Sequence, residues 1–129
     1  MRRERFSLLR FLLLASIILV ACGSNRFLQS VSVTPAAAAS RAQFTATGVY
    51  NATPSPLDIT STATWCIGTS NGICQPGLPG VVQLVAGSAQ CLKGARGTFT
   101  VLAGQSGTVT GVNGAFPLDP FGAAQITCP

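Results

Sequence analysis

Residues 97–103 read Gly-Thr-Phe-Thr-Val-Leu-Ala, and this stretch decides the fold class. Its apolar positions Phe99, Val101 and Ala103 alternate with Thr98, Thr100 and Leu102. Alternation with a period of two is typical of a β-strand that turns one face toward a core. A strand buried in a parallel sheet would be apolar on both faces. We therefore expect an antiparallel strand here, covered on one side.

The same alternation recurs on both sides of this stretch. It places three further sets of side chains on inward faces: Val31 with Val33, Phe44 with Ala46, and Ala124 with Ile126 and Cys128. Short runs rich in Val, Thr, Ile and Phe are separated by Gly, Pro, Asn and Ser, which indicates an all-β domain. We predict strands over residues 28–34, 42–48, 60–66, 81–86, 89–92, 97–103 and 122–128. About seven short antiparallel strands suit a β-sandwich.

The segment Ala36–Ser40, between the first two predicted strands, has several interpretations. It is rich in small residues, so it could be a linker, and its four alanines favour a helix. The run is too short to nucleate a stable helix by itself. Because strand-like patterns flank it on both sides, we expect a loop.

The order and spacing of these segments resemble a bacterial immunoglobulin-like domain of group 2, which occurs in surface proteins and adhesins. The resemblance implies an immunoglobulin-like antiparallel β-sandwich over residues 28–129. It rests on the segments LQSVSVTP (28–35), QFTATGVY (43–50), DIT (58–60), ATW (63–65), GTFTVLA (97–103) and AQIT (124–127). The chain departs from the family pattern in the Cys66–Cys74 loop, in Gln75–Gly80 and in Gly111–Phe121, which lengthens the last hairpin. Binding residues concentrate on loops of this kind.

The first 21 residues predict a lipoprotein signal peptide. Four arginines within residues 2–10 precede an apolar run over residues 11–21, which are the basic and hydrophobic regions of an export signal. The apolar run is about half of the roughly 20 residues that a membrane-spanning helix needs. We therefore expect no permanent transmembrane span.

Residues Leu19, Val20, Ala21 and Cys22 resemble the bacterial lipobox, in which the cysteine thiol receives diacylglycerol. The resemblance implies cleavage after Ala21 and a lipid anchor, palmitate included, on Cys22. The alternative is an ordinary secretory signal with Cys22 in a disulfide. We expect residues 22–27 to form the lipid-anchored tether, with Gly23–Arg26 as a flexible spacer. Gly23 implies, by analogy with lipoprotein sorting, the outer membrane where the host has one.

An even set of cysteines remains once Cys22 is set aside: Cys66, Cys74, Cys91 and Cys128. In a small exported chain they indicate two disulfides, and four cysteines allow three pairings. We favour Cys66 with Cys74 because they flank a short turn, and Cys91 with Cys128 because both fall on predicted strands. Closing these loops would contribute about 2.6 and 3.9 kcal/mol respectively.

Composition argues against binding of nucleic acid through a charged face. The formal net charge is +5, but beyond residue 22 four cations oppose Asp58 and Asp119, which leaves +2. No basic cluster is visible in the mature sequence. The cations are Arg26, Arg41, Lys93 and Arg96.

Composition also argues against an enzyme. The chain has no histidine, so it lacks Ser–His and Cys–His pairs and the commonest metal ligand. The mature chain has two acidic side chains, Asp58 and Asp119, which are too few for a calcium cluster and form a glycosidase pair only if the fold brings them together. A Ser–Lys dyad on Lys93 has no motif behind it. We expect no catalytic residue, no cofactor and no metal.

Three aromatic residues are candidates for contact with a ligand. Trp65 falls where immunoglobulin-like folds bury a tryptophan, the alternative being a platform on which a sugar stacks. Tyr50 and Phe116 lie beside turn residues and are better candidates for exposure, although packing under a loop is the favoured interpretation.

We therefore expect a non-catalytic, lipid-anchored cell-envelope protein. Its immunoglobulin-like module would serve adhesion, would bind carbohydrate or protein, or would act as a spacer. The alternative is an accessory lipoprotein subunit of an envelope assembly. Such a subunit would bind its partner through unpaired backbone groups of the first or last strand.

Overall fold

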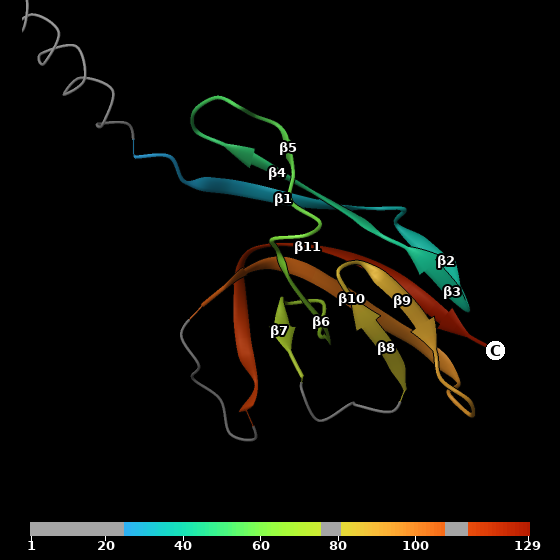
Figure 1. Ribbon diagram of the computed structural model, residues 1–129. Helices are drawn as coiled ribbons and strands as arrows, with labels where there is room; N and C mark the ends of the chain where they lie inside the picture. The colour runs from blue at the N-terminus through green and yellow to red at the C-terminus, as the bar shows by residue number, and fades with distance from the viewer. Residues whose placement is uncertain (1–24, 76–80, 108–113) are drawn as a thin grey trace, which may run out of the picture.

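The computed structural model describes residues 25–75, 81–107 and 114–129, which form an all-β fold (Figure 1). No helix among these residues is long and apolar enough to cross a membrane. The signal peptide and Cys22 lie outside the described residues. The strands are β1 (Leu28–Thr34), β2 (Ala37–Ala39), β3 (Arg41–Gln43), β4 (Thr45–Tyr50), β5 (Leu57–Asp58), β6 (Thr64–Gly68), β7 (Ile73–Cys74), β8 (Val82–Val85), β9 (Ser88–Cys91), β10 (Gly97–Ser106) and β11 (Phe116–Cys128).

The strands form three sheets. The first has the order β1-β4-β5, the second β3-β9-β8, and the third β10-β6-β7-β11-β2. In the third sheet β10 also pairs with β11, so that β10, β6, β7 and β11 close into a ring. All pairings are antiparallel except that of β11 with β2. The predicted all-β, mainly antiparallel fold is confirmed, and the closed ring gives part of it a barrel-like character.

Several strands begin or end at residues other than those predicted. The strand at 28–34 is β1, but 42–48 divides at Phe44 into β3 and β4, which pair with β9 and β1 respectively. The strand placed at 60–66 is found at Thr64–Gly68, after a turn over Thr60–Thr62. The strand placed at 122–128 already begins at Phe116.

The prediction of a loop at Ala36–Ser40 is wrong, because Ala37–Ala39 forms β2. This strand runs parallel to Gln125–Thr127 of β11. The Gln125 N–H donates to the Ala36 carbonyl at 2.9 Å, and the Ser40 N–H donates to the Thr127 carbonyl at 3.0 Å. Pairing with a distant segment therefore overrides the low strand preference of alanine.

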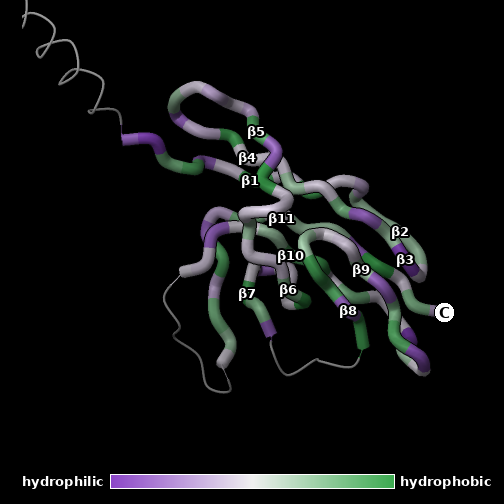
Figure 2. Tube along the Cα trace, viewed as in Figure 1, coloured by the Kyte–Doolittle hydropathy of each residue, from purple (hydrophilic) through white to green (hydrophobic). Residues whose placement is uncertain are grey.

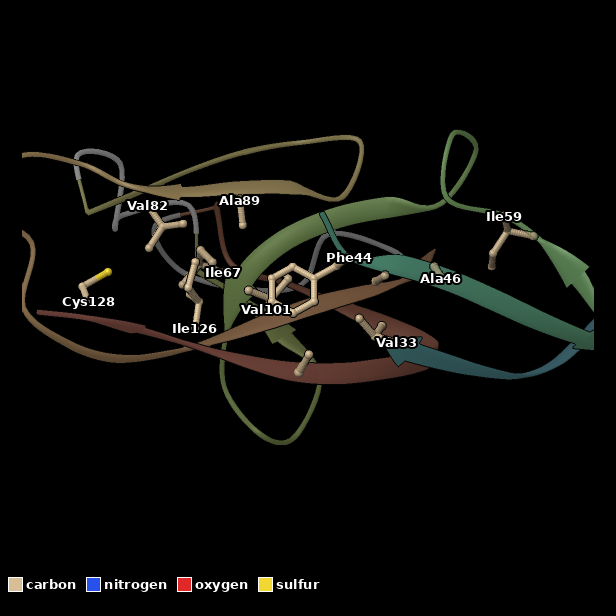
Figure 3. Close-up of a cluster of buried hydrophobic side chains, with 12 residues drawn as sticks. Val33, Phe44, Ala46, Ile59, Ile67, Val82, Ala89, Val101, Ile126 and Cys128 are labelled. Atoms are coloured by element: carbon tan, nitrogen blue, oxygen red, sulfur yellow. The ribbon is translucent and has the colours of Figure 1, made fainter. Parts of the chain in front are cut away.

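The main hydrophobic core lies where the three sheets meet (Figure 3). Phe44, which has no exposed surface, occupies its middle, with Val101, Val33 and Ile67 around it. Alternation correctly predicted much of this core. The inward residues that are buried as expected are Val33, Phe44, Ala46, Val101, Ala103, Ala124, Ile126 and Cys128, while Val31 and Phe99 are partly buried against the cluster.

A second, smaller core lies between the four strands of the ring. It contains Cys74, Leu102 and Leu118, with Cys66, Phe116 and Phe121 packed against them. Leu102 was expected on the uncovered face of its strand, yet it has no exposed surface. The expectation is wrong because β10 is covered on both faces: by the main core on one side and by the ring on the other.

The first sheet packs closely on the third at Gly122. A Cβ atom at this position would lie 2.8 Å from the Val31 carbonyl oxygen and 3.1 Å from the Ser32 Cα atom. Glycine is therefore required where β1 crosses β11, because the obstructing atoms belong to the backbone.

Candidate functional site

The lipobox residues Leu19, Val20, Ala21 and Cys22 all lie outside the described residues. The other four cysteines form two disulfides, Cys66–Cys74 and Cys91–Cys128, with Cα–Cα distances of 5.6 and 5.7 Å. These are the pairings that the sequence favoured. The first disulfide joins β6 to β7 within the ring, and the second joins the end of β9 to the end of β11.

The three aromatic candidates do not meet at one site. Trp65 is partly buried against the main core, and its Nε1–H donates to the Thr60 carbonyl at 2.8 Å. Phe116 packs against the second core. Tyr50 is partly buried, and the guanidinium carbon of Arg26 lies 3.9 Å from its ring centroid. All three side chains therefore have packing roles, and Tyr50 also lines a cavity.

The two carboxylates fall on different sheets, Asp58 on β5 and Asp119 on β11. The pKa of Asp58 is lowered from 3.8 because the side chain and the backbone N–H of Thr60 donate hydrogen bonds to the carboxylate. In the described part of the chain, no three His, Cys, Asp or Glu side chains gather as a metal site would require.

The tether is fastened to the domain where it enters the fold. We call this arrangement the latch: residues Asn25–Phe27 held against the loop Asn51–Pro54. The Asn51 side chain accepts from the Phe27 N–H at 2.8 Å and donates to the Asn25 carbonyl at 2.9 Å. The Asn51 N–H donates to the Phe27 carbonyl at 3.2 Å. One asparagine thus joins two segments that lie 24 to 26 residues apart in the sequence.

Arg26 completes the latch. Its Nη2 donates to the Pro54 carbonyl at 2.6 Å, its Nε lies 3.4 Å from the Ala52 carbonyl, and its guanidinium covers one face of Tyr50. A cation over an aromatic ring contributes about 0.5–1 kcal/mol at an exposed position. Asn25 and Arg26, which we expected in a flexible spacer, are both hydrogen-bonded to the loop.

A cavity of about 440 Å³ lies beside the latch. We call it the proximal pocket. Tyr50, Leu28 and Ile59 supply apolar walls, and a polar rim comes from Thr62, Thr64, Gln105 and Ser106. The pocket contains neither carboxylate, so it offers no general base.

The residues of the latch could not be recognised from the sequence. Nothing in the order Asn51-Ala52-Thr53-Pro54 distinguishes it from an ordinary turn. From the sequence, Arg26 is visible only as one positive charge within the predicted spacer. The pairing that brings them together, Leu28 opposite Tyr50, depends on the register of β1 with β4.

Comparison with known proteins gives no family assignment for this chain. No protein family matches the chain, and no curated protein matches it either.

Proposed function

We propose that this chain is a non-catalytic, lipid-anchored cell-envelope protein whose immunoglobulin-like module binds a carbohydrate or protein partner away from the membrane. The basic and apolar segments before Cys22 support export, and the lipobox resemblance supports lipidation of its thiol. The absence of histidine from the sequence supports a role without catalysis.

The latch is the observation that carries this proposal. Asn25 follows Cys22 by three residues, a span of at most about 10 Å of extended chain. Because Asn25 and Arg26 are bound to the loop Asn51–Pro54, a lipid on Cys22 would hold this end of the domain next to the bilayer. An anchored domain with such a short free segment has a preferred orientation, unlike a domain on a long flexible linker.

Exposed apolar side chains at the same end support the orientation. Phe27 is 56% exposed, Val49 40% and Leu57 37%. Val49 and Leu57 lie within two pairs of the Leu28–Tyr50 pair in the first sheet. Single exposed apolar residues are common on protein surfaces, but here they gather at the end that the anchor would bring to the lipid.

The proposal also includes an immunoglobulin-like type for the domain. Its support is the run of antiparallel strands around one main core. The closed ring of β10, β6, β7 and β11 differs from a two-sheet sandwich, and two of its strands, β6 and β7, are joined by the Cys66–Cys74 loop where the sequence departs from the family.

Fractionation of cells that produce the wild type and Cys22→Ala tests the anchor. We expect the wild type in the membrane fraction, with acyl mass on an N-terminal peptide that begins at Cys22, and the variant without that mass. A membrane-bound variant, together with a wild type that carries no lipid, would refute the proposal.

The latch has its own test. Asn51→Ala should leave the protein in the membrane but raise amide hydrogen exchange at Asn25–Phe27, since it removes the two side-chain bonds. Asn71→Ala, at an exposed turn between β6 and β7, is the matched control. Equal exchange in both variants would show that the latch does not hold the tether.

A second candidate function is that of an accessory subunit bound through an edge strand. Strand β1 pairs with β4 alone among the described strands, so its other edge is open to strand addition. The other candidate, β11, offers less open edge because it pairs with β10 and, over parts of its length, also with β7 and β2.

A photo-crosslinking residue at the exposed Ser30 of β1 tests this alternative in intact cells. We expect one stoichiometric envelope partner if β1 is an interface. Substitution at exposed Thr98 on β10 is the control. A similar crosslinking pattern from both positions would argue against strand addition.

A further inference from the structure

Another cavity lies at the end opposite the latch, and it is lined by most of the mature chain's cations. We call it the distal pocket. Its volume is about 390 Å³, and Arg41, Lys93 and Arg96 line it. These are three of the four cations beyond residue 22. Neither Asp58 nor Asp119 lines it.

The length of strand β10 gives an estimate of the distance between the distal pocket and the proximal pocket. Arg96 in the distal pocket immediately precedes this strand, and Gln105 near its other end lines the proximal pocket. Nine residues of strand cover about 30 Å. In Figure 1 the described chain enters at the upper left, whereas the turn after β9 and the C-terminus lie on the right. Figure 2 shows that turn as hydrophilic.

Strand pairing brings the cations together from distant parts of the sequence. Arg41 lies opposite Gln90 in the β3–β9 pair, so that it faces the connection from β9 to β10, which carries Lys93 and Arg96. The sequence alone shows no basic cluster because Arg41 lies some fifty residues before Lys93. The fold supplies the cluster.

The pocket is held in shape by its own backbone. The Cys91 N–H donates to the Ser40 carbonyl at 2.8 Å, and the Ala95 N–H donates to the Leu92 carbonyl at 3.0 Å across the turn. The disulfide Cys91–Cys128 ties the same turn to the end of β11. A site whose frame is fixed loses less conformational entropy when a ligand binds.

No Asp or Glu side chain among the residues that line the pocket neutralises its charges. Arg41 Nη2 donates to the Gln90 side-chain oxygen at 2.7 Å, which orients the guanidinium without cancelling its charge. Arg41, Lys93 and Arg96 are all exposed. Pro129 also lines the pocket, so a carboxylate at the end of the chain would reduce the positive charge there. Mutual repulsion of three cations is relieved when an anion enters.

We propose that the distal pocket binds a phosphate group, with Arg41, Lys93 and Arg96 as its ligands. Two guanidinium groups present planar pairs of donors that match phosphate oxygens, and the ammonium adds a third charge. A single carboxylate would neutralise only one of the three cations, whereas inorganic phosphate or a phosphate monoester, with up to two charges, uses more of them. Gly94, between Lys93 and Arg96, has open space where its Cβ would be, so the turn presents backbone to the pocket without a side chain.

Titration of the protein with inorganic phosphate tests the proposal. The protein is purified from cells as they process it, in a neutral detergent, and amide NMR shifts report binding at residues 92–96. We expect saturable shifts that weaken as salt is raised, because exposed charges are screened. Arg41→Gln and Arg96→Gln should each weaken binding by about tenfold.

Ser70→Asp is the control for net charge. Ser70 is exposed at the turn between β6 and β7, outside the pocket, and this change lowers the net charge by one, as Arg→Gln does. We expect its phosphate affinity to stay close to that of the wild type. Equal weakening in all three variants, or no saturable shift in the wild type, would overturn the site.

Two further titrations distinguish the sources of the phosphate. Soluble polyphosphate represents an anionic polymer outside the membrane, and phosphatidylglycerol added to the micelle represents a lipid headgroup. A response at residues 92–96 to either probe, lost in Arg96→Gln, supports the site and identifies the source. No response to either probe would contradict it.

Discussion

Asp58 shows how one residue can fix a turn. Its carboxylate accepts from the Thr60 N–H at 2.9 Å, and the Thr60 hydroxyl accepts from the Ala46 N–H at 3.0 Å. The two residues thereby fasten the turn after β5 to β4. This explains why the strand expected from residue 60 begins only at Thr64.

The stability of the fold should depend on the charge of Asp58. The pKa of Asp58 lies below its ordinary value in the folded chain because of the bonds from Thr60. The stabilisation is therefore complete above the unfolded pKa of about 3.9 and is lost as the pH falls through the lower folded pKa. We expect NMR titration to give a midpoint below 3.8. Thr60→Val should raise that midpoint and Thr60→Ser should keep it low; identical midpoints would show that Thr60 is not the cause.

Phe44 should be the most sensitive position of the main core. It has no exposed surface and sits where the chain passes from β3 to β4. Phe44→Ala should lower the free energy of unfolding by about 3–5 kcal/mol, measured by urea denaturation. Val85→Ala, at a side chain that is 64% exposed, should change it by less than about 0.5 kcal/mol. Similar losses in the two variants would mean that the core is centred elsewhere.

At the scale of the element, the crossing of β1 over β11 depends on Gly122. Gly122→Ala places a methyl group against the backbone of Val31 and Ser32. We expect a loss of about 1–3 kcal/mol, opposite in sign to the gain that Gly→Ala brings where the backbone is free. Urea denaturation measures it, with the exposed neighbour Ala123→Ser as control. A gain in stability at Gly122 would refute the close crossing.

The strands themselves illustrate what alternation can and cannot predict. It identified the inward face of β10 and of β4, because a side chain's face depends only on its position along the strand. It could not predict that the chain changes sheets at Phe44, since the alternation continues unbroken while the hydrogen-bonding partner changes. Alternation also did not predict that Leu102 is buried by residues of other strands.

At the scale of the whole molecule, the two disulfides should differ in their contribution. Cys91–Cys128 spans 37 residues and Cys66–Cys74 spans 8. Replacing both cysteines by alanine should cost about 3.9 kcal/mol for the first pair and about 2.6 kcal/mol for the second. Urea denaturation of the two double variants measures the order. A larger loss for Cys66–Cys74 would show that packing inside the ring, and not loop closure, determines the difference.

The two ends of the molecule differ in how far they can be predicted from the sequence. The N-terminal signal is predicted from adjacent residues alone, and it stays a prediction because those residues lie outside the described structure. The distal pocket depends on Arg41 being brought to the turn after β9 through the pairing of β3 with β9. Long-range contacts of this kind arise from tertiary structure, and a single sequence does not encode them in adjacent residues.

The position of β11 in the sheets has a consequence for how the chain is made. It pairs with β10, β7 and β2 and packs against β1. Among the described strands β11 is synthesised last, so neither the ring nor the main core can close until residues 116–128 have emerged. Until then Cys91 has no disulfide partner, and β10 lacks its pairing with β11. A chain that closes its ring only after β11 is available stays incompletely folded during most of its synthesis, and the export that we propose would require an unfolded chain.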